Sequence, residues 1–239
     1  MTQEEIKQKL KNEKKHGFDS LRLLVEVLRG EGGCVWDREQ THESIRNNII
    51  EETYEVVEAI DKSDSALLRE ELGDVMLQVV FHSRIEEEKG SFDIEDVTTE
   101  VVDKMILRHP HVFGDVKVAD SGEVLDNWEK IKKEEKQRKT VKESMLSVPK
   151  QLPALMRAAK VIKKAKKDGW QPDCGENEIV KAAEAFSRAK TVDEKNFAAA
   201  SLIFALMAGS KEELDIERAL SDKADEFINT YKECGKELT

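Results

Sequence analysis

Residues 45–79 read IRNNIIEETYEVVEAIDKSDSALLREELGDVMLQV, and this stretch decides the fold. Apolar residues recur in it every three or four positions, first at Ile45, Ile49, Val56 and Ile60, then at Leu68, Leu72, Val75 and Val79. This spacing places each set on one face of an α-helix, with a turn at 61–65 between the two helices. We expect long helices at about 41–60 and 66–89, packed antiparallel because the turn is short.

Helical periodicity continues on both sides of this stretch. Prolines are scarce and aromatic residues make up only 5% of the chain, which does not favour a β-sandwich. Residues 148–153 read VPKQLP, and two prolines so close together resist a continuous helix, so we expect a linker there. We expect a loop at 109–122 and further helices at 18–28, 94–108, 123–138, 154–167, 178–190, 194–208 and 211–234. The sequence therefore predicts an all-α protein.

An internal repeat divides the chain. Residues 96–104, DVTTEVVDK, parallel residues 215–223, DIERALSDK, and the helices that precede each block correspond in order. Self-similarity of this kind indicates two copies of one helical module. We expect an N-terminal module at 1–146 and a C-terminal module at 147–239, joined by the linker near Pro149 and Pro153.

Charge and cysteine content narrow the range of partners. The net charge is −11, whereas binding to duplex DNA needs a basic face. Cys34, Cys174 and Cys234 are far apart in the sequence, so neither a zinc knuckle nor a disulfide framework is indicated. Residues 1–15 are charged throughout, and no stretch approaches the apolar length of a membrane span. We expect a soluble, cytoplasmic protein with no nucleic-acid and no membrane partner.

Four carboxylates stand out in the two long helices. Glu52 falls on the apolar face of the first helix, and Glu55 lies one turn further on. Glu71 and Asp74 are also three residues apart and border the apolar face of the second helix. An acid within an apolar stripe is unfavourable unless its charge is compensated, and oxygen ligands favour Mg²⁺ or Mn²⁺. The alternative is a charged face that simply meets solvent, which is common in a chain with 37% charged residues.

Two basic residues downstream could meet a phosphate. Lys104 and Arg108 are four residues apart on one helical face, directly before His109. At this spacing they could hold a polyphosphate, the arginine by its planar fork and the lysine as a point charge. The alternative is an ordinary basic helix end that complements the helix dipole.

Several short motifs, taken in order, resemble the MazG family. They are CVWDREQTH at 34–42, EETYE at 51–55, EELGD at 70–74, RHPHVFG at 108–114, WEKIK at 128–132 and LPALMRA at 152–158. The resemblance implies an all-α fold of two tandem modules of the all-α NTP pyrophosphatase type, and a homodimer formed as a helix bundle. It also implies an enzyme that hydrolyses NTPs and dNTPs to the monophosphate and pyrophosphate with Mg²⁺.

The resemblance further implies roles for single residues. Metal ligands of the family map onto Glu52, Glu55, Glu71 and Asp74. Its nucleotide-contacting positions map onto Asn48, Glu51, Glu70, Lys104, Arg108 and Trp128. Glu51 or Glu70 could accept a proton from the attacking water, while Lys104 and Arg108 would stabilise negative charge on the phosphates. Trp128 could stack on a base or fill an apolar seam. Asn48 and Leu67 differ from lysines at matching positions of some active modules, and Val35 replaces a usual proline.

The repeat provides an internal comparison for the acidic site. Alignment of the modules places Glu178 at Glu52, Lys181 at Glu55, Ala198 at Glu71 and Ser201 at Asp74. Lys223 matches Lys104, whereas Phe227 takes the place of Arg108. We therefore expect catalysis in the N-terminal module, although some family members are active in the C-terminal one. Two alternatives stay open: a non-catalytic helical interaction or regulatory protein, and a narrow-specificity dUTP- or dCTP-type pyrophosphatase.

Overall fold

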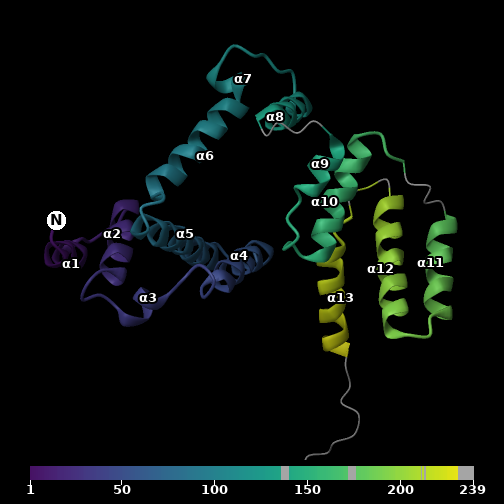
Figure 1. Cartoon of the computed structure of the whole chain (residues 1–239), viewed down its shortest axis with the longest axis horizontal. Coiled ribbons are helices and arrows are strands. Elements are labelled where there is room, and N and C mark those ends of the chain that lie inside the picture. The colour runs from purple at the N-terminus through teal and green to yellow at the C-terminus, as the bar shows by residue number, and fades with distance from the viewer. Residues whose placement is uncertain (136–139, 172–175, 211, 213, 231–239) are drawn as a thin grey trace, which may run out of the picture. The chain divides into compact units, whose positions relative to one another are not determined.

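The computed structural model describes residues 1–135, 140–171, 176–210, 212 and 214–230. Within these residues the chain forms thirteen α-helices and no strand (Figure 1), which confirms the predicted all-α fold. The chain divides into two compact units, Met1–Leu125 and Asp126–Thr239. None of the described helices is both long enough and apolar enough to cross a bilayer.

The first unit begins with α1 (Gln3–Asn12), α2 (Phe18–Arg29) and α3 (Val35–Glu39). The sequence pattern predicts α2 but neither of the other two. Although α1 is highly charged, Thr2 and Glu5 form a capping box at its start. Its one buried residue, Ile6, packs against Leu23 and Val27 of α2. A single well-placed apolar side chain thus anchors a helix that hydrophobic periodicity does not reveal.

The two long predicted helices are present as α4 (Arg46–Asp61) and α5 (Ser65–Glu88), which form a helical hairpin (Figure 1). The carboxylate of Asp64 caps α5 by accepting hydrogen bonds from the backbone N–H groups of Ala66 and Leu67. The short turn between the helices therefore ends in a defined start signal, and the antiparallel pairing follows from it.

The start of α4 differs from the prediction of a helix from about residue 41. The hydroxyl groups of Thr41 and Ser44 each accept a hydrogen bond from the other residue's backbone N–H. Such local bonds offer the backbone an alternative to the helix. The helix consequently begins only at Arg46, after Ile45.

The core of the first unit lies where α2, the start of α4, the second half of α5 and the start of α6 (Ile94–Arg108) meet. It consists of the buried residues Val25, Ile45, Val80, Phe81, Ile85 and Ile94. Further toward the turn of the hairpin, α4 and α5 leave several apolar side chains exposed: Ile50, Tyr54, Val57, Leu72 and Met76. One copy of the chain therefore buries only part of the apolar stripes on these two helices.

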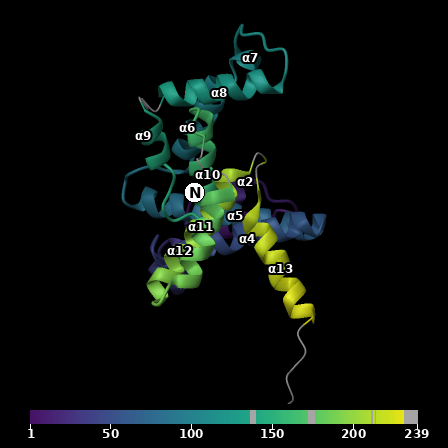
Figure 2. The same cartoon turned by 90° about the vertical axis from the view of Figure 1, so that its right-hand side faces the viewer.

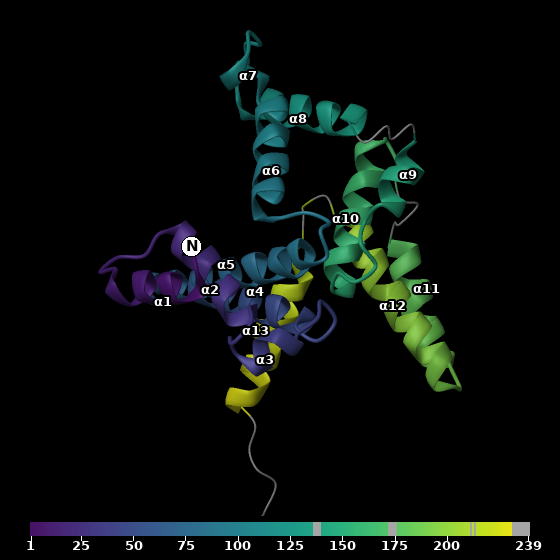
Figure 3. The ribbon, with the colours of Figure 1, turned by 60° about the vertical axis from the view of Figure 1, so that its left-hand side comes forward.

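Helix α6 begins and ends at the predicted residues. Asp93 and Asp96 form a capping box at its start. Ile94 packs into the core against α5, and the helix then leads away from the α4–α5 hairpin (Figures 1 and 3). The predicted loop at 109–122 is partly wrong, because it contains the short helix α7 (Pro110–Phe113) and the start of α8 (Ser121–Glu135).

The second unit contains α9 (Val141–Leu146), α10 (Ala154–Lys167), α11 (Glu176–Arg188), α12 (Val192–Gly209) and α13 (Ile216–Thr230). Helices α11 and α12 lie side by side as a second hairpin (Figure 1). Helix α10 packs on α12 through Ile162, Met207 and Ala208. Helix α13 contacts α10 and diverges from the α11–α12 pair (Figure 2). The predicted helical residues 136–138, 211, 213 and 231–234, with Cys174 and Cys234, lie outside the described residues; Cys34 is an exposed free thiol.

Candidate metal centre

The α4–α5 hairpin brings acidic side chains together. Glu52 and Glu55 lie one turn apart on α4, and Glu71 and Asp74 lie one turn apart on α5. Carboxylate oxygens of Glu52, Glu55 and Glu71 all lie within 4.8 Å of one another. In the part of the chain that the structure describes, no other three acidic, histidine or cysteine side chains converge in this way. Three of the four predicted metal ligands thus share one site.

Burial and mutual repulsion raise the pKa values of two of these acids. Glu71 is only 8% exposed, and burial raises its pKa above the usual value, with Glu55, Glu70 and Asp74 adding to the effect. Burial is also the main cause of the raised pKa of Glu52, followed by the nearby charge of Asp74. Asp74 therefore lies close enough to act on both acids, although it is not one of the three converging residues.

The donor set fits a metal ion. Among the described residues, no lysine, arginine or histidine forms an ion pair with Glu52, Glu55, Glu71 or Asp74. Partly buried negative charge without a partner is unfavourable, and a divalent cation would compensate it. Because all the donors are carboxylate oxygens, the site suits a hard cation better than zinc or copper.

Of the other residues implied as nucleotide contacts, some lie beside the acidic cluster on α4 and α5, and others lie on different helices. Asn48 is half-buried one turn before Glu52, while Glu51 and Glu70 are exposed beside the ligands. On α6, Lys104 is half-buried, and Arg108 is buried at 4% exposure. Both residues lie in the second half of α6, which leads away from the α4–α5 hairpin (Figure 3).

Trp128 lies on α8 in the second unit. Its side chain is half-buried, and the Nζ atom of Lys132 sits 4.4 Å from the centre of an indole ring. An ammonium at this distance over an aromatic face makes a favourable cation–π contact. Within its own unit, Trp128 therefore serves as a platform for a lysine.

A polar network that sequence reasoning missed ties the segment before α4 to α5. The Nδ1 atoms of His42 and His82 are 2.8 Å apart, and His42 Nε2 lies 2.7 Å from a carboxylate oxygen of Glu86. Hydrogen bonds from Lys89 and His42 lower the pKa of Glu86 to about 2. Burial lowers the pKa of His82, and the charge on His42 adds to this effect. The only sign of this network in the sequence is the i, i+4 spacing of His82 and Glu86.

Arg29 provides a second connection to the same end of α5. Its side chain is 5% exposed and donates to both carboxylate oxygens of Glu88, at 3.0 and 2.7 Å. It also donates to the backbone carbonyls of Asp37 and Gln40, at 2.6 and 3.1 Å. A buried bidentate pair is a strong, directional contact. These bonds hold the loop before α4 in place and so help to set where α4 begins.

The second hairpin differs at the positions that correspond to the acidic site. Glu178 forms an ion pair with Lys181 at 2.8 Å, so its charge is already compensated. Ala198 is buried on α12, and the hydroxyl of Ser201 donates to the carbonyl of Phe197 at 2.8 Å. At these four positions the second hairpin therefore has a single carboxylate, that of Glu178, and it is paired with a lysine.

Known proteins resemble the chain both locally and over most of its length. Residues 40–113, which include all four carboxylates, match the family model described as the MazG nucleotide pyrophosphohydrolase domain. The chain is 39% identical over 220 residues to "Nucleoside triphosphate pyrophosphohydrolase/pyrophosphatase MazG" of Thermotoga maritima. The aligned residues cover 90% of this chain and 84% of that protein.

Two further relatives match a shorter part of the chain. "Nucleoside triphosphate pyrophosphohydrolase" of Escherichia coli (strain K12) is 44% identical over 154 residues, which is 64% of this chain and 59% of that protein. "Uncharacterized protein YabN" of Bacillus subtilis is 53% identical over 149 residues, or 62% of this chain and 30% of that protein. The chain thus spans less than two thirds of the length of each of these two relatives.

Proposed function

The chain belongs to the MazG family of nucleotide pyrophosphohydrolases, and from this membership we propose that it hydrolyses NTPs and dNTPs to the monophosphate and pyrophosphate. The observation that carries the proposal is the convergence of Glu52, Glu55 and Glu71 within 4.8 Å, inside the range that matches the family. Hydrolysis of a polyphosphate needs compensation of its negative charge, which a metal ion on these carboxylates would supply.

We propose Mg²⁺ as the ion, with Mn²⁺ as a substitute, held by Glu52, Glu55, Glu71 and Asp74. When bound, it would neutralise phosphate charge, align the triphosphate and lower the pKa of a water molecule. The raised pKa values of Glu52 and Glu71 support this role: burial, followed by repulsion from neighbouring carboxylates, disfavours their charged forms, and a bound cation would offset both effects.

The protein's own side chains would guide the proton and the nucleotide. Water adds across the bond between the α- and β-phosphates: a new oxygen–phosphorus bond forms, the bridging bond breaks, and pyrophosphate leaves. Glu51 or Glu70, both exposed next to a proposed ligand, would accept the proton of the water. Asn48 would contact the nucleotide from the same face of α4, and Trp128 would stack on the base.

We also propose that two copies pair through the α4–α5 hairpin. Tyr54 and Val57 on α4 and Leu72 and Met76 on α5 are each more than 40% exposed, an apolar surface that a second copy would bury. In such a dimer, Lys104 of one copy could reach the carboxylates of the other. That would explain how α6 can contribute to a site from which it leads away in its own copy.

Mixed dimers test this arrangement. Chains with Glu71→Ala and chains with Lys104→Ala should each be inactive alone. If Lys104 acts across the interface, mixing the two should restore activity, because one of the two sites then regains both residues. If both residues act within one copy, the mixture stays inactive.

The C-terminal module would have a non-catalytic role. The Glu178–Lys181 ion pair and the buried Ala198 at the corresponding positions support this. A contribution to dimer stability or to nucleotide access fits a module that keeps its helices without its acids. The small number of widely spaced cysteines suits a reducing cytoplasm, which stays a prediction.

One experiment tests the proposed activity directly. Pyrophosphate release is measured from a panel of NTPs and dNTPs, with Mg²⁺ and with EDTA, for the wild type and for Glu71→Ala. We expect metal-dependent release that Glu71→Ala abolishes. Absence of release from every nucleotide would sink the proposal, and unchanged activity in Glu71→Ala would move the site elsewhere. A preference for dUTP or dCTP alone would favour the narrow-specificity alternative.

A further inference from the structure

Two half-buried amide side chains lie beside the proposed metal centre. Asn48 lies on α4 four residues before Glu52, and Gln78 lies on α5 four residues after Asp74. Residues four apart share one face of a helix, so both amides continue the face that carries the carboxylates. Neither side chain forms a hydrogen bond with any residue that the structure describes. Their donors and acceptors are therefore available to a ligand.

Contacts on both sides fix the level of these two amides along the hairpin. On one side lies the acidic cluster, whose carboxylate oxygens converge within 4.8 Å. On the other side, the Nδ1 atoms of His42 and His82 are 2.8 Å apart. Because α4 and α5 pair as a hairpin, Asn48 and Gln78 lie between these two levels. Each amide is thus one helical turn, about 6 Å along the axis, from the nearest proposed metal ligand on its own helix.

The opposite side of the acidic cluster, toward the turn of the hairpin, is apolar at the matching positions. Ala59 follows Glu55 by four residues, and Leu67 precedes Glu71 by four. Ala59 is completely buried, and Leu67 is half-buried. Hydrocarbon side chains cannot form hydrogen bonds with a sugar. The polar nucleoside part of a nucleotide therefore fits the side that carries Asn48 and Gln78.

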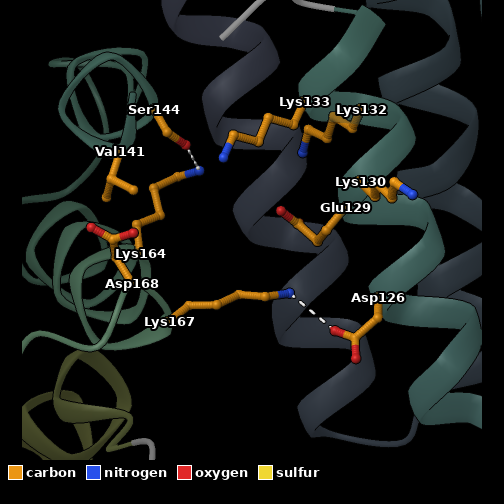
Figure 4. Close-up of a pocket in the computed structure, with 10 residues that line it drawn as sticks. All are labelled: Asp126, Glu129, Lys130, Lys132, Lys133, Val141, Ser144, Lys164, Lys167 and Asp168. Carbon is orange, nitrogen blue, oxygen red and sulfur yellow. Dashed lines mark hydrogen bonds and ion pairs between the residues drawn. The ribbon is translucent and has the colours of Figure 1, made fainter. Parts of the chain in front are cut away.

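The pocket between α8, α9 and α10 of the second unit differs in this respect (Figure 4). Its Lys164 donates a hydrogen bond to the hydroxyl of Ser144 at 2.8 Å. Its Lys167 forms an ion pair with Asp126 at 3.3 Å. These polar groups already contact one another, whereas the two amides on the hairpin have no such partner among the described residues.

We propose that Gln78 binds the nucleotide substrate, with its amide hydrogen-bonded to a hydroxyl group of the ribose. This inference rests on the proposed function, because it takes the triphosphate to be held by a metal ion on the carboxylates. The ribose is joined directly to the α-phosphate, which places it within reach of a residue one turn away. A side-chain amide both donates and accepts, which matches a hydroxyl group. The bond forms when the substrate binds, so Gln78 acts on affinity and not on the chemical step.

Steady-state kinetics of the full-length chain with a panel of NTPs and the matching dNTPs test the proposal. Gln78→Leu removes the amide at similar volume and should raise KM for NTPs about fivefold to tenfold, with kcat changed less than about twofold. A KM that rises for NTPs alone assigns the bond to the 2′-hydroxyl, and an equal rise for dNTPs assigns it to the 3′-hydroxyl. Gln78→Asn, which keeps an amide, should recover part of the affinity. An unchanged KM for every nucleotide, or a loss confined to kcat, would overturn the proposal.

A binding measurement separates this proposal from the proposed hydrolysis. The probe is α,β-methylene-ATP, in which the bond to be broken is replaced, titrated by calorimetry into the full-length chain with Mg²⁺. Gln78→Leu should weaken its binding by the same factor as it raises KM. Gln8→Ala changes an exposed glutamine of α1 and should leave the binding unchanged.

The two failures have different signatures in these experiments. A wild type that binds the analogue more tightly than Gln78→Leu but releases no pyrophosphate would contradict the hydrolysis and support the role of Gln78. Equal affinities of the wild type and Gln78→Leu would overturn the role of Gln78, even with hydrolysis confirmed. Absence of binding to the wild type up to about 1 mM would overturn it as well.

Discussion

His42 and His82 stack with their ring centres 5.0 Å apart and their Nδ1 atoms 2.8 Å apart, which couples the turn before α4 to the second half of α5. A hydrogen bond between two imidazole nitrogens needs one protonated and one unprotonated atom. His42 also meets Glu86 through its other nitrogen, so the protonation states of all three side chains are linked.

Acidification is expected to weaken the fold through His82. Burial and the charge on His42 lower its pKa from 6.5, so the folded state binds a proton less readily than the unfolded state. The contribution to stability is therefore complete above pH 6.5 and declines as the pH falls below it. The free energy of unfolding, measured in urea above and below that pH, should change less with pH for His82→Gln than for the wild type. His16→Gln, which changes an exposed histidine, should behave like the wild type.

Glu71→Gln is expected to raise the stability of the metal-free protein and to lower its activity. Because the pKa of Glu71 is raised, the metal-free folded state loses stability as the pH rises through that pKa. The neutral amide removes this effect, so thermal unfolding in EDTA at neutral pH should shift upward. The same change should lower pyrophosphate release by roughly a hundredfold or more. Glu58→Gln changes an exposed residue of α4 and should alter neither the stability nor the activity. A Glu71→Gln variant that is less stable than the wild type would contradict the electrostatic explanation.

Corresponding substitutions in the two modules should have opposite outcomes. Glu52→Ala removes a proposed metal ligand and should reduce pyrophosphate release by roughly a hundredfold or more. Glu178→Ala removes the corresponding side chain, which only pairs with Lys181, and should leave release unchanged. Steady-state rates across a Mg²⁺ titration provide the measurement. A comparable loss of activity in both variants would show that the C-terminal module shares the chemistry.

Gly73→Ala is expected to stabilise α5. Glycine within a helix is less favourable than alanine by about 1 kcal/mol, and a Cβ atom at Gly73 would meet nothing within 4 Å. The gain in unfolding free energy should be about 0.5–1 kcal/mol in urea titrations. Gly114→Ala is the contrasting variant, because its Cβ would lie 3.0 Å from the carbonyl oxygen of Pro110. A loss of stability in Gly73→Ala would mean that another surface approaches this position closely.

Periodicity predicted the long helices well and the short ones poorly. Helices α6 and α10 have the predicted bounds because local signals delimit them. An Asp capping box begins α6 and Pro110 follows its end, whereas Pro153 directly precedes α10. Helices α1, α3 and α9 were missed because each has ten residues or fewer, and an apolar stripe is not discernible over so few turns. Start signals such as the capping box at Thr140 and Glu143 were the better evidence there.

The acidic cluster was accessible from sequence because two helices joined by a short turn have few ways to pack. Residue spacing and the short turn together therefore placed Glu52 near Glu71. The direction of α6 was not accessible in this way. It depends on how segments separated by loops pack together, and residue spacing within a helix carries no information about that.

The repulsion among Glu52, Glu55 and Glu71 has a consequence for the lifetime of the protein. A cation that binds only the folded chain shifts the folding equilibrium by mass action, in proportion to the logarithm of its concentration. Proteases attack mainly transiently opened chains. If the proposed site holds a cation, its depletion would expose the α4–α5 hairpin to cleavage as well as stop turnover. The three side chains proposed to serve hydrolysis would then also make the abundance of the protein respond to metal supply.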